Sequence, residues 1–269
     1  MERQGLGRTA ERPLAVVIDL DGTVYRGNQL IPGADGAIEA LRGCSHPVVF
    51  VTNAIESCAE HSTKLRGLNI PAEPDDIVNA TSTIIQYLRS EMPQATVFAV
   101  SDPPLVEALE TEFSLSEDPA QIDVVIASCD RSFDYHKLNI AFQALRRGAH
   151  FLATNADASA PVEGGLLPDA GAVIGALQGC TARKPDHVVG KPSQLMAKAV
   201  LERLGRPADE CLIVGDNLES DILMGHRVGM KTALVLSGVT HPSDVNGAPV
   251  KPDHVLGSIA ELPRLLGCY

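Results

Sequence analysis

Short apolar runs alternate with amphipathic segments along almost the whole chain. Runs of four or five apolar residues bounded by turn residues are typical of buried strands, and apolar residues three and four apart are typical of helices. The clearest helix pattern is Leu138, Ala141, Phe142 and Leu145. The pattern predicts strands over residues 14–18, 47–51, 96–100, 124–128, 151–154, 187–189, 211–214 and 232–236, and helices over residues 37–42, 59–66, 81–89, 105–111, 136–146, 171–181, 194–204, 221–228 and 259–266.

Strands that alternate with helices predict an α/β fold with a largely parallel sheet. The chain of 269 residues is long for one hydrophobic core and sufficient for two domains. The middle third of the chain has its own alternation of predicted strands and helices, and the last third resumes the pattern of the first third. We therefore predict a doubly wound, Rossmann-like parallel-sheet core from residues 1–77 and 185–269, with an inserted α/β domain over residues 78–184.

Composition and charge narrow the class of protein. Apolar residues make up 45% of the chain and charged residues 21%, as in ordinary globular proteins. The net charge of −12 argues against nucleic acid or an anionic membrane as a partner, and no apolar run reaches the roughly 18–20 residues that span a bilayer. Residues 1–13 lack the apolar region of a signal peptide, and six scattered cysteines favour reduced thiols, so we expect a cytoplasmic protein.

Polar side chains directly follow three of the predicted strands, and a lysine precedes a predicted helix: Asp19 with Asp21, Thr52 with Asn53, Asp216, and Lys191. Because the carboxyl ends of parallel strands open on one edge of a sheet, we expect these side chains to converge. One like-charge pair at about 4 Å costs roughly 4 kcal/mol at an effective dielectric constant of about 20. Three carboxylates beside a phosphate group therefore require a cation, and an all-oxygen site suits Mg²⁺.

The residue types indicate phosphoryl transfer. A carboxylate can attack phosphorus and form an aspartyl-phosphate. Asp19 is placed to attack, and Asp21 is placed to act first as an acid and then as a base. Thr52, Asn53 and Lys191 are placed to hold phosphate oxygens. Taken alone, Thr52-Asn53 would indicate a turn and Lys191 an exposed start of a helix. The interpretation as a phosphate site therefore depends on all these residues together.

Four segments together resemble the motifs of the haloacid dehalogenase-like (HAD) hydrolase superfamily. They are Asp19-Leu-Asp-Gly-Thr23, Val51-Thr52-Asn53, Gly190-Lys-Pro-Ser193 and Gly215-Asp-Asn-Leu-Glu-Ser-Asp221. Their order, with an insertion between the second and third, is similar to subfamily IIA, the NagD-like sugar-phosphate phosphatases. The resemblance covers nearly the whole chain and implies that the inserted domain is a C2-type cap, which shapes substrate specificity.

The resemblance also implies roles for individual residues. Asp19 would be the nucleophile and a Mg²⁺ ligand, and Asp21 the general acid/base, bound to Mg²⁺ through its carbonyl. The remaining implied residues are Asp216 as third metal ligand, Asp221 supporting the metal, Asn217 near the substrate, and Asn155 and Asp157 in the cap near the leaving group. From the sequence, a helix cap is about as good an interpretation of Asp221 as a role at the metal. A solvated loop position is likewise about as good an interpretation of Asp157 as a role near the leaving group.

We expect a Mg²⁺-dependent phosphatase acting on small phosphorylated metabolites: sugar phosphates, with nucleotides and aryl phosphates as further candidates. We expect a small phosphate ester as the partner, and neither nucleic acid nor a membrane. The sequence does not determine whether the chain forms a homodimer through the caps. Two alternatives remain. One is a phospho-acceptor or sensing module, because receiver domains also place Asp, Thr and Lys at strand ends. The other is a sugar phosphotransferase of the same superfamily.

Overall fold

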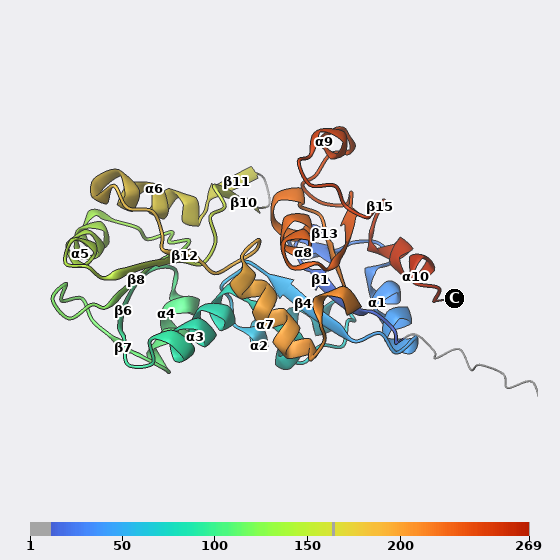
Figure 1. Cartoon of the computed structure of the whole chain (residues 1–269), viewed down its shortest axis with the longest axis horizontal. Helices are drawn as coiled ribbons and strands as arrows, with labels where there is room; N and C mark the ends of the chain where they lie inside the picture. The colour runs from blue at the N-terminus through green and yellow to red at the C-terminus, as the bar shows by residue number, and fades with distance from the viewer. Residues whose placement is uncertain (1–11, 163–164, 269) are drawn as a thin grey trace, which may run out of the picture.

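The larger sheet has six strands that all run parallel, and it forms the lobe on the right of Figure 1. The computed structural model describes residues 12–162 and 165–268. The strand order is β15-β14-β13-β1-β4-β5. The strands are β1 (Ala15–Asp19), β4 (Val48–Thr52), β5 (Ile77–Asn79), β13 (Cys211–Gly215), β14 (Lys231–Val235) and β15 (His254–Leu256). Because β1 pairs with β13 on one side and β4 on the other, the three motif-bearing strands are adjacent.

Helices cover both faces of this sheet, as a doubly wound fold requires. Along β1, Val16 and Ile18 pack on one face while Ala15 and Val17 pack on the other, because successive strand side chains alternate. The first face packs against α1 (Ala34–Gly43), α2 (Cys58–Gly67) and α10 (Leu262–Leu265); the second packs against α3 (Ala80–Glu91), α7 (Gln194–Leu204) and α8 (Leu223–Val228). The predicted Rossmann-like core is confirmed.

The inserted segment forms a second parallel sheet, in the left-hand lobe of Figure 1. Its order is β12-β9-β8-β6-β7. Its elements are β6 (Thr96–Val100), α4 (Pro103–Glu110), β7 (Ser114–Leu115), β8 (Val124–Ala127), α5 (Tyr135–Arg146), β9 (His150–Ala153), α6 (Ala170–Thr181) and β12 (His187–Val188). The predicted limits of the insertion, 78 and 184, stay a prediction. Strand pairing continues the six-stranded sheet to residue 79 and the five-stranded sheet to residue 188.

One hydrophobic cluster runs through both lobes. Ile84 and Leu88 of α3 belong to the same cluster as Val17 of β1 and as Val97 and Ile126 of the cap sheet. The opposite face of the cap sheet has a separate cluster with α5 and α6. The cap therefore shares one of its two hydrophobic faces with the core domain.

Several short elements depart from the expected pattern. Two antiparallel hairpins occupy expected loops: β2 (Tyr25–Arg26) with β3 (Gln29–Leu30), and β10 (Ser159–Val162) with β11 (Gly165–Pro168). The helix predicted from residue 221 starts earlier, as a π-helical turn over Leu218–Ile222 that leads into α8. A further helix, α9, spans Pro242–Gly247.

The expectation that all six cysteines are free thiols is wrong for one pair. Cys44 and Cys268 form a disulfide, with Cα atoms 6.0 Å apart. The cause is tertiary: the last helix, through Leu262, packs in the same cluster as Leu41 of α1, and this brings two residues 224 positions apart together. Cys58, Cys129, Cys180 and Cys211 are free.

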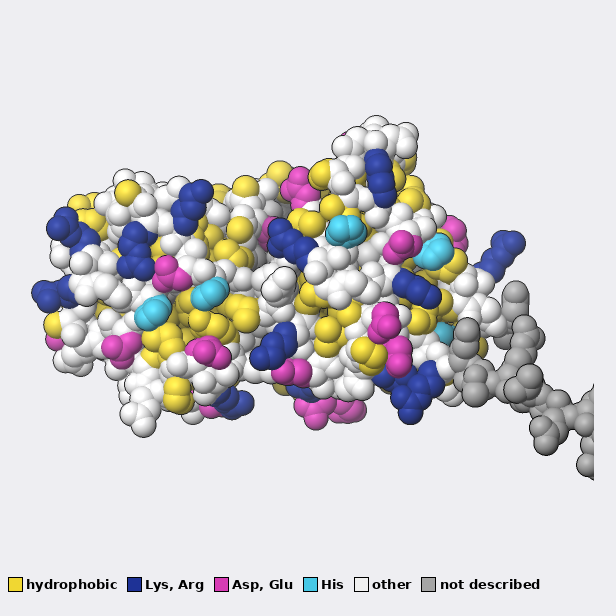
Figure 2. Space-filling view, in the orientation of Figure 1, with side chains coloured by type: hydrophobic (Ala, Val, Ile, Leu, Met, Phe, Trp, Pro, Cys, Tyr) yellow, Lys and Arg dark blue, Asp and Glu magenta, His cyan; other side chains and the backbone are white. Residues whose placement is uncertain are grey.

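The surface carries charges of both signs. On the face shown in Figure 2, basic and acidic side chains are interspersed over both lobes and interrupt the hydrophobic ones. Within residues 12–162 and 165–268, no helix has the length and apolar character needed to cross a membrane.

Candidate active site

Three buried carboxylates converge at the carboxyl end of the central strands. Asp19 ends β1, Asp216 follows β13, and Asp221 lies in the π-helical turn after it. One oxygen of each lies within 4.8 Å of the others, and the side chains are almost fully buried. The structure thus brings together Asp19 and Asp216, two of the three carboxylates expected to converge, with Asp221, which the resemblance assigned to support the metal; Asp21 is not in this cluster.

Lys191 joins two of these carboxylates. Its Nζ donates to Asp19 Oδ1 at 2.5 Å and to Asp221 Oδ1 at 2.7 Å, and the lysine is itself buried. The second oxygen of Asp19, Oδ2, accepts from Thr23 Oγ1 at 3.0 Å. The second oxygen of Asp221, Oδ2, accepts from the backbone amide of Asn217 at 3.1 Å. Both oxygens of both carboxylates are therefore already hydrogen-bonded.

Asp216 is the carboxylate without a cationic partner. Among the described residues no Lys, Arg or His lies within 4.0 Å of it, and its Oδ2 accepts from the Val239 amide at 2.6 Å. Backbone packs closely around it. Gly22 adopts φ +86°, and a Cβ at Gly22 or Gly238 would overlap the Asp216 carboxylate.

The pKa values follow from this burial. Burial raises the pKa of Asp19 well above its usual range, although the Lys191 ammonium opposes the shift. Burial and the Asp221 carboxylate together raise the pKa of Asp216 to about 6, against the opposing effects of the Val239 amide and Lys191. For Lys191, the two carboxylates outweigh burial and raise its pKa. An ionised Asp216 is therefore electrostatically unfavourable until a cation binds.

Asp21 lies at the rim of the cavity described below and not in the carboxylate cluster. Its side chain is exposed to solvent. The surrounding protein atoms nevertheless raise the pKa of its carboxyl above the usual value, while Lys64 acts against this shift. A raised pKa suits a group that donates a proton near neutral pH.

Thr52 and Asn53 connect the end of β4 to its surroundings. Thr52 is buried, and its Oγ1 accepts from the Ala54 amide at 3.1 Å. Asn53 accepts from the Lys191 amide at 2.7 Å and donates to the Asp157 carboxylate at 3.1 Å. Asn53 therefore contacts both the lysine motif and the cap.

A cavity of about 340 Å³ lies between the two lobes. Asp19, Asp21, Lys191 and Asp216 line its core side, and Asn155 and Asp157 line its cap side. Asn155 is buried, and its Oδ1 accepts from the Asp157 amide at 2.9 Å. The remaining predicted site residues on its wall are Thr52, Asn53, Asn217 and Asp221.

Asn217, which was predicted to lie near the substrate, also makes hydrogen bonds that stabilise the local backbone. Its Oδ1 accepts from the amides of Glu219 at 2.8 Å and Ser220 at 3.3 Å, so it caps the π-helical turn. This cap holds Asp221 against Gly215, where a Cβ would overlap the Asp221 side chain. Asn217 thus positions Asp221 and also lines the cavity.

Six further polar residues line the cavity and were missed from the sequence: Glu56, Asp102, Cys129, Ser159, Asp169 and Ser220. Asp169 precedes α6 and accepts from the Ala170 amide at 2.7 Å. An acidic residue directly before a helix was a visible capping signal, yet nothing in the sequence indicated that this helix begins at the cavity.

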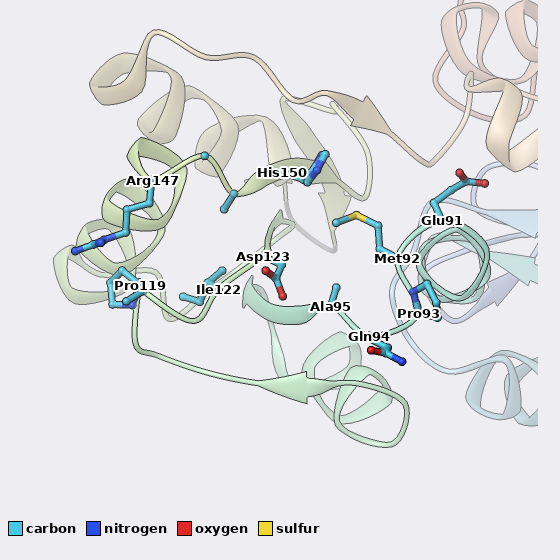
Figure 3. Close-up of a pocket in the computed structure, with 13 residues that line it drawn as sticks. Glu91, Met92, Pro93, Gln94, Ala95, Pro119, Ile122, Asp123, Arg147 and His150 are labelled. Carbon is cyan, nitrogen blue, oxygen red and sulfur yellow. The ribbon is translucent and has the colours of Figure 1, made fainter.

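A larger cavity, of about 720 Å³, lies elsewhere in the cap and is shown in Figure 3. It is lined by residues 91–95, 119–123 and 147–150, which precede β6, β8 and β9. This is the amino end of the parallel strands, whereas α/β sheets bind ligands at the carboxyl end. The smaller cavity, which contains the carboxylate cluster, is therefore the candidate active site.

Three carboxylates at the carboxyl edge of a parallel sheet, with a lysine beside them, form the arrangement expected of a phosphoryl-transfer site. Residues 16–112 match the family model of the haloacid dehalogenase-like hydrolases, and residues 188–262 match a second model of HAD-like hydrolases. A "Sugar-phosphatase AraL" of Bacillus subtilis is 39% identical over 259 residues, which cover 96% of this chain and 94% of the relative. The chain belongs to the haloacid dehalogenase-like hydrolase superfamily, in its NagD-like subfamily IIA.

Solved structures agree with this assignment. A p-nitrophenyl phosphatase from Archaeoglobus fulgidus superposes with a TM-score of 0.89 at 29% identity, covering 94% of this chain and 100% of its own. NagD from Escherichia coli superposes with a TM-score of 0.85 at 28% identity, covering 93% of this chain and 98% of its own. The protein is a phosphoric monoester hydrolase whose inserted domain is the cap.

Proposed function

We propose that this phosphatase depends on Mg²⁺ and forms an aspartyl-phosphate on Asp19. Its substrates would be small phosphorylated metabolites, sugar phosphates first, with aryl phosphates and nucleotides as further candidates. The observation that carries the proposal is the arrangement of three buried carboxylates around one lysine, which leaves Asp216 without a cation.

The donor set suits Mg²⁺. It contains only carboxylate oxygens, which this hard cation prefers, and one oxygen of each residue lies within 4.8 Å of the others, near enough for a shared ion. Asp19 and Asp216 would hold the ion directly, and Asp221, which accepts from Lys191 Nζ and from the Asn217 backbone amide, would orient Lys191. Bound there, Mg²⁺ would neutralise charge on the carboxylates and the phosphate oxygens.

In the first step an Asp19 carboxylate oxygen attacks phosphorus, and the bond from phosphorus to the leaving oxygen breaks. Asp21 in its protonated form, which its raised pKa favours, donates its proton to that oxygen. Lys191 stabilises the developing negative charge, since its ammonium is fixed beside Asp19. The products are an alcohol and an aspartyl-phosphate on Asp19.

In the second step Asp21, now ionised, takes a proton from water. The water oxygen attacks phosphorus, the acyl-phosphate bond breaks, and Asp19 returns to its carboxylate form with release of inorganic phosphate. The contact between Asn53 and Asp157 keeps the cap over the site and limits the access of bulk water.

Phosphate release from 4-nitrophenyl phosphate, with and without Mg²⁺, tests the proposal. We expect activity that requires the metal and is lost in Asp19→Asn. A matched control is Asp209→Asn, which removes the same charge from an exposed residue outside the cavity. Metal-independent activity, or full activity of Asp19→Asn, would contradict the proposal.

Two further measurements separate the alternatives. An aspartyl-phosphate that lasts minutes to hours would favour a signalling module, and sub-second turnover favours the enzyme. A phosphorylated second sugar that appears without free phosphate would favour a phosphotransferase. A homodimer stays a prediction, which sedimentation velocity tests.

A further inference from the structure

The charged residues that line the active-site cavity are strongly unbalanced. Among the described residues on its wall are eight carboxylates, Asp19, Asp21, Glu56, Asp102, Asp157, Asp169, Asp216 and Asp221, but one cation, Lys191. Lys191 is already paired with Asp19 and Asp221. Among the described residues that line the cavity, no Lys or Arg is therefore free to pair with a second negative group on a substrate.

The cap side of the wall carries the unbalanced charge. Asp102 is neutralised, because Arg131 Nε donates to it at 2.6 Å. Asp157 and Asp169 form no ion pair within residues 12–162 and 165–268: Asp157 accepts from the neutral Asn53 amide, and Asp169 accepts from the backbone of Ala170. Asp157 keeps one oxygen without a hydrogen-bond donor among these contacts. Asp169 also has the side chains of Asn155 and Cys129 as hydrogen-bond partners, but an ionised carboxylate offers about four lone-pair sites and so keeps acceptor capacity.

These two carboxylates are held on one rigid surface. The Asp169 amide donates to the Ala158 carbonyl at 3.1 Å, and the Gly171 amide donates to the Asp157 carbonyl at 2.9 Å. A Cβ at Gly171 would lie 2.8 Å from that carbonyl, so the loop and the start of α6 are in close contact. Burial raises the pKa of Asp169, and the nearby Asp157 raises it further, as two neighbouring acids would.

We infer that Asp157 and Asp169 select phosphate esters whose leaving group donates hydrogen bonds and bears no negative charge, such as sugars and polyols. Hydroxyl groups can donate to the remaining lone pairs of these carboxylates. A carboxylate or second phosphate on the same leaving group would meet like charges in a partly desolvated cavity without a counter-ion. This inference rests on the proposed function and narrows its substrate class.

A matched pair of substrates tests the inference. Glycerol 3-phosphate and 3-phosphoglycerate differ in one terminal group, a hydroxymethyl group against a carboxylate. We expect kcat/KM to favour the neutral member by about 100-fold, since like charges a few ångströms apart at an effective dielectric constant of about 20 produce that order of discrimination. If only aryl phosphates react, 4-(hydroxymethyl)phenyl phosphate and 4-carboxyphenyl phosphate form the corresponding pair.

Asp169→Asn then locates the origin of the selectivity. Asn is as good a helix N-cap as Asp, so α6 keeps its start. We expect the preference for the neutral substrate to fall by about tenfold, as one of two uncompensated charges disappears. Asp209→Asn should leave the preference unchanged. Since both substrates share the phosphate chemistry, a general loss of fold or catalysis lowers both rates and leaves their ratio the same.

The outcomes distinguish the two proposals. Equal kcat/KM for the acidic and neutral members, or an unchanged ratio in Asp169→Asn, overturns the inference about specificity while the phosphatase stands. If the protein with Mg²⁺ releases phosphate neither from 4-nitrophenyl phosphate nor from a single one of the four matched esters, the proposed function is overturned, and this inference falls with it.

Discussion

Replacing Asp216 by Asn should make the metal-free protein more stable while it abolishes Mg²⁺-dependent activity. Asp216 is buried, has no cationic partner among the described residues, and faces Asp221. Its pKa of about 6 lies well above the ordinary Asp value of about 3.9. Because the folded state binds this proton more tightly than the unfolded state, folding stability falls as the pH rises from about 4 to 6.

The size of the effect follows from that difference. At about 1.36 kcal/mol for each pH unit, an ionised Asp216 costs about 3 kcal/mol above pH 7. Asn carries no charge, and its side-chain oxygen can still accept the hydrogen bond from the Val239 amide. We therefore expect the free energy of unfolding of Asp216→Asn to exceed that of the parent by about 2–3 kcal/mol at pH 8, and Tm to rise by several degrees.

Urea unfolding in EDTA, at pH 8 and at pH 4.5, measures this prediction. At pH 4.5 the parent Asp216 is mostly protonated, so the advantage of Asp216→Asn should largely disappear. Adding Mg²⁺ at pH 8 should raise the stability of the parent and leave that of Asp216→Asn unchanged, because a ligand stabilises the state that binds it. The reasoning is refuted if the variant is no more stable at pH 8, or if its advantage is the same at both pH values.

Three further substitutions test separate parts of the site. Lys191→Met should destabilise the metal-free protein by about 3–5 kcal/mol in urea unfolding at pH 7, because it leaves Asp19 and Asp221 buried without their cation; unchanged stability would contradict this. Asp21→Asn should keep the fold and the Mg²⁺-induced rise in Tm but lower kcat on an alkyl phosphate by about 10²–10⁴-fold, and a kcat within about twofold of the parent would exclude Asp21 as the acid. Gly238→Ala should displace the Asp216 carboxylate and raise the Mg²⁺ concentration for half-maximal activity; Gly247→Ala, where a Cβ has open space, is its control.

The core of the fold was predictable because its signals are local. The run before Asp19 is apolar at every position and becomes a central strand, buried on both faces. Ser193 directly precedes the helix predicted over residues 194–204, and in the structure its Oγ accepts from the Met196 amide at 3.1 Å, as a helix cap does. Once the strands are known to be parallel, their ends must share one edge, so the meeting of Asp19 with Asp216 followed from topology alone.

The parts that were missed depend on contacts distant in sequence. The hairpin β10–β11 is short and rich in Gly and Pro, so it gave no clear strand pattern. The assignment of α3 to the insertion stays a prediction, because its apolar residues belong to a cluster that spans both lobes. The disulfide joins residues whose proximity only the packing of the C-terminal segment on α1 creates.

The same distinction explains why the catalytic end of the cavity was predicted more fully than its cap end, where the sequence indicated Asn155 and Asp157 but not Asp169. Asp19 and Lys191 belong to motifs at strand and helix ends, where backbone geometry alone fixes the direction of the side chain. Asp169 reaches the cavity because its amide and the Gly171 amide bond to the loop that carries Asp157, a pairing between segments with no shared pattern. The phosphate chemistry is thus encoded by the parallel sheet, whereas the charge that would select the leaving group arises from tertiary contacts of the cap. A change of one cap residue, such as Asp169, should therefore alter which ester is hydrolysed without altering how the phosphate is transferred.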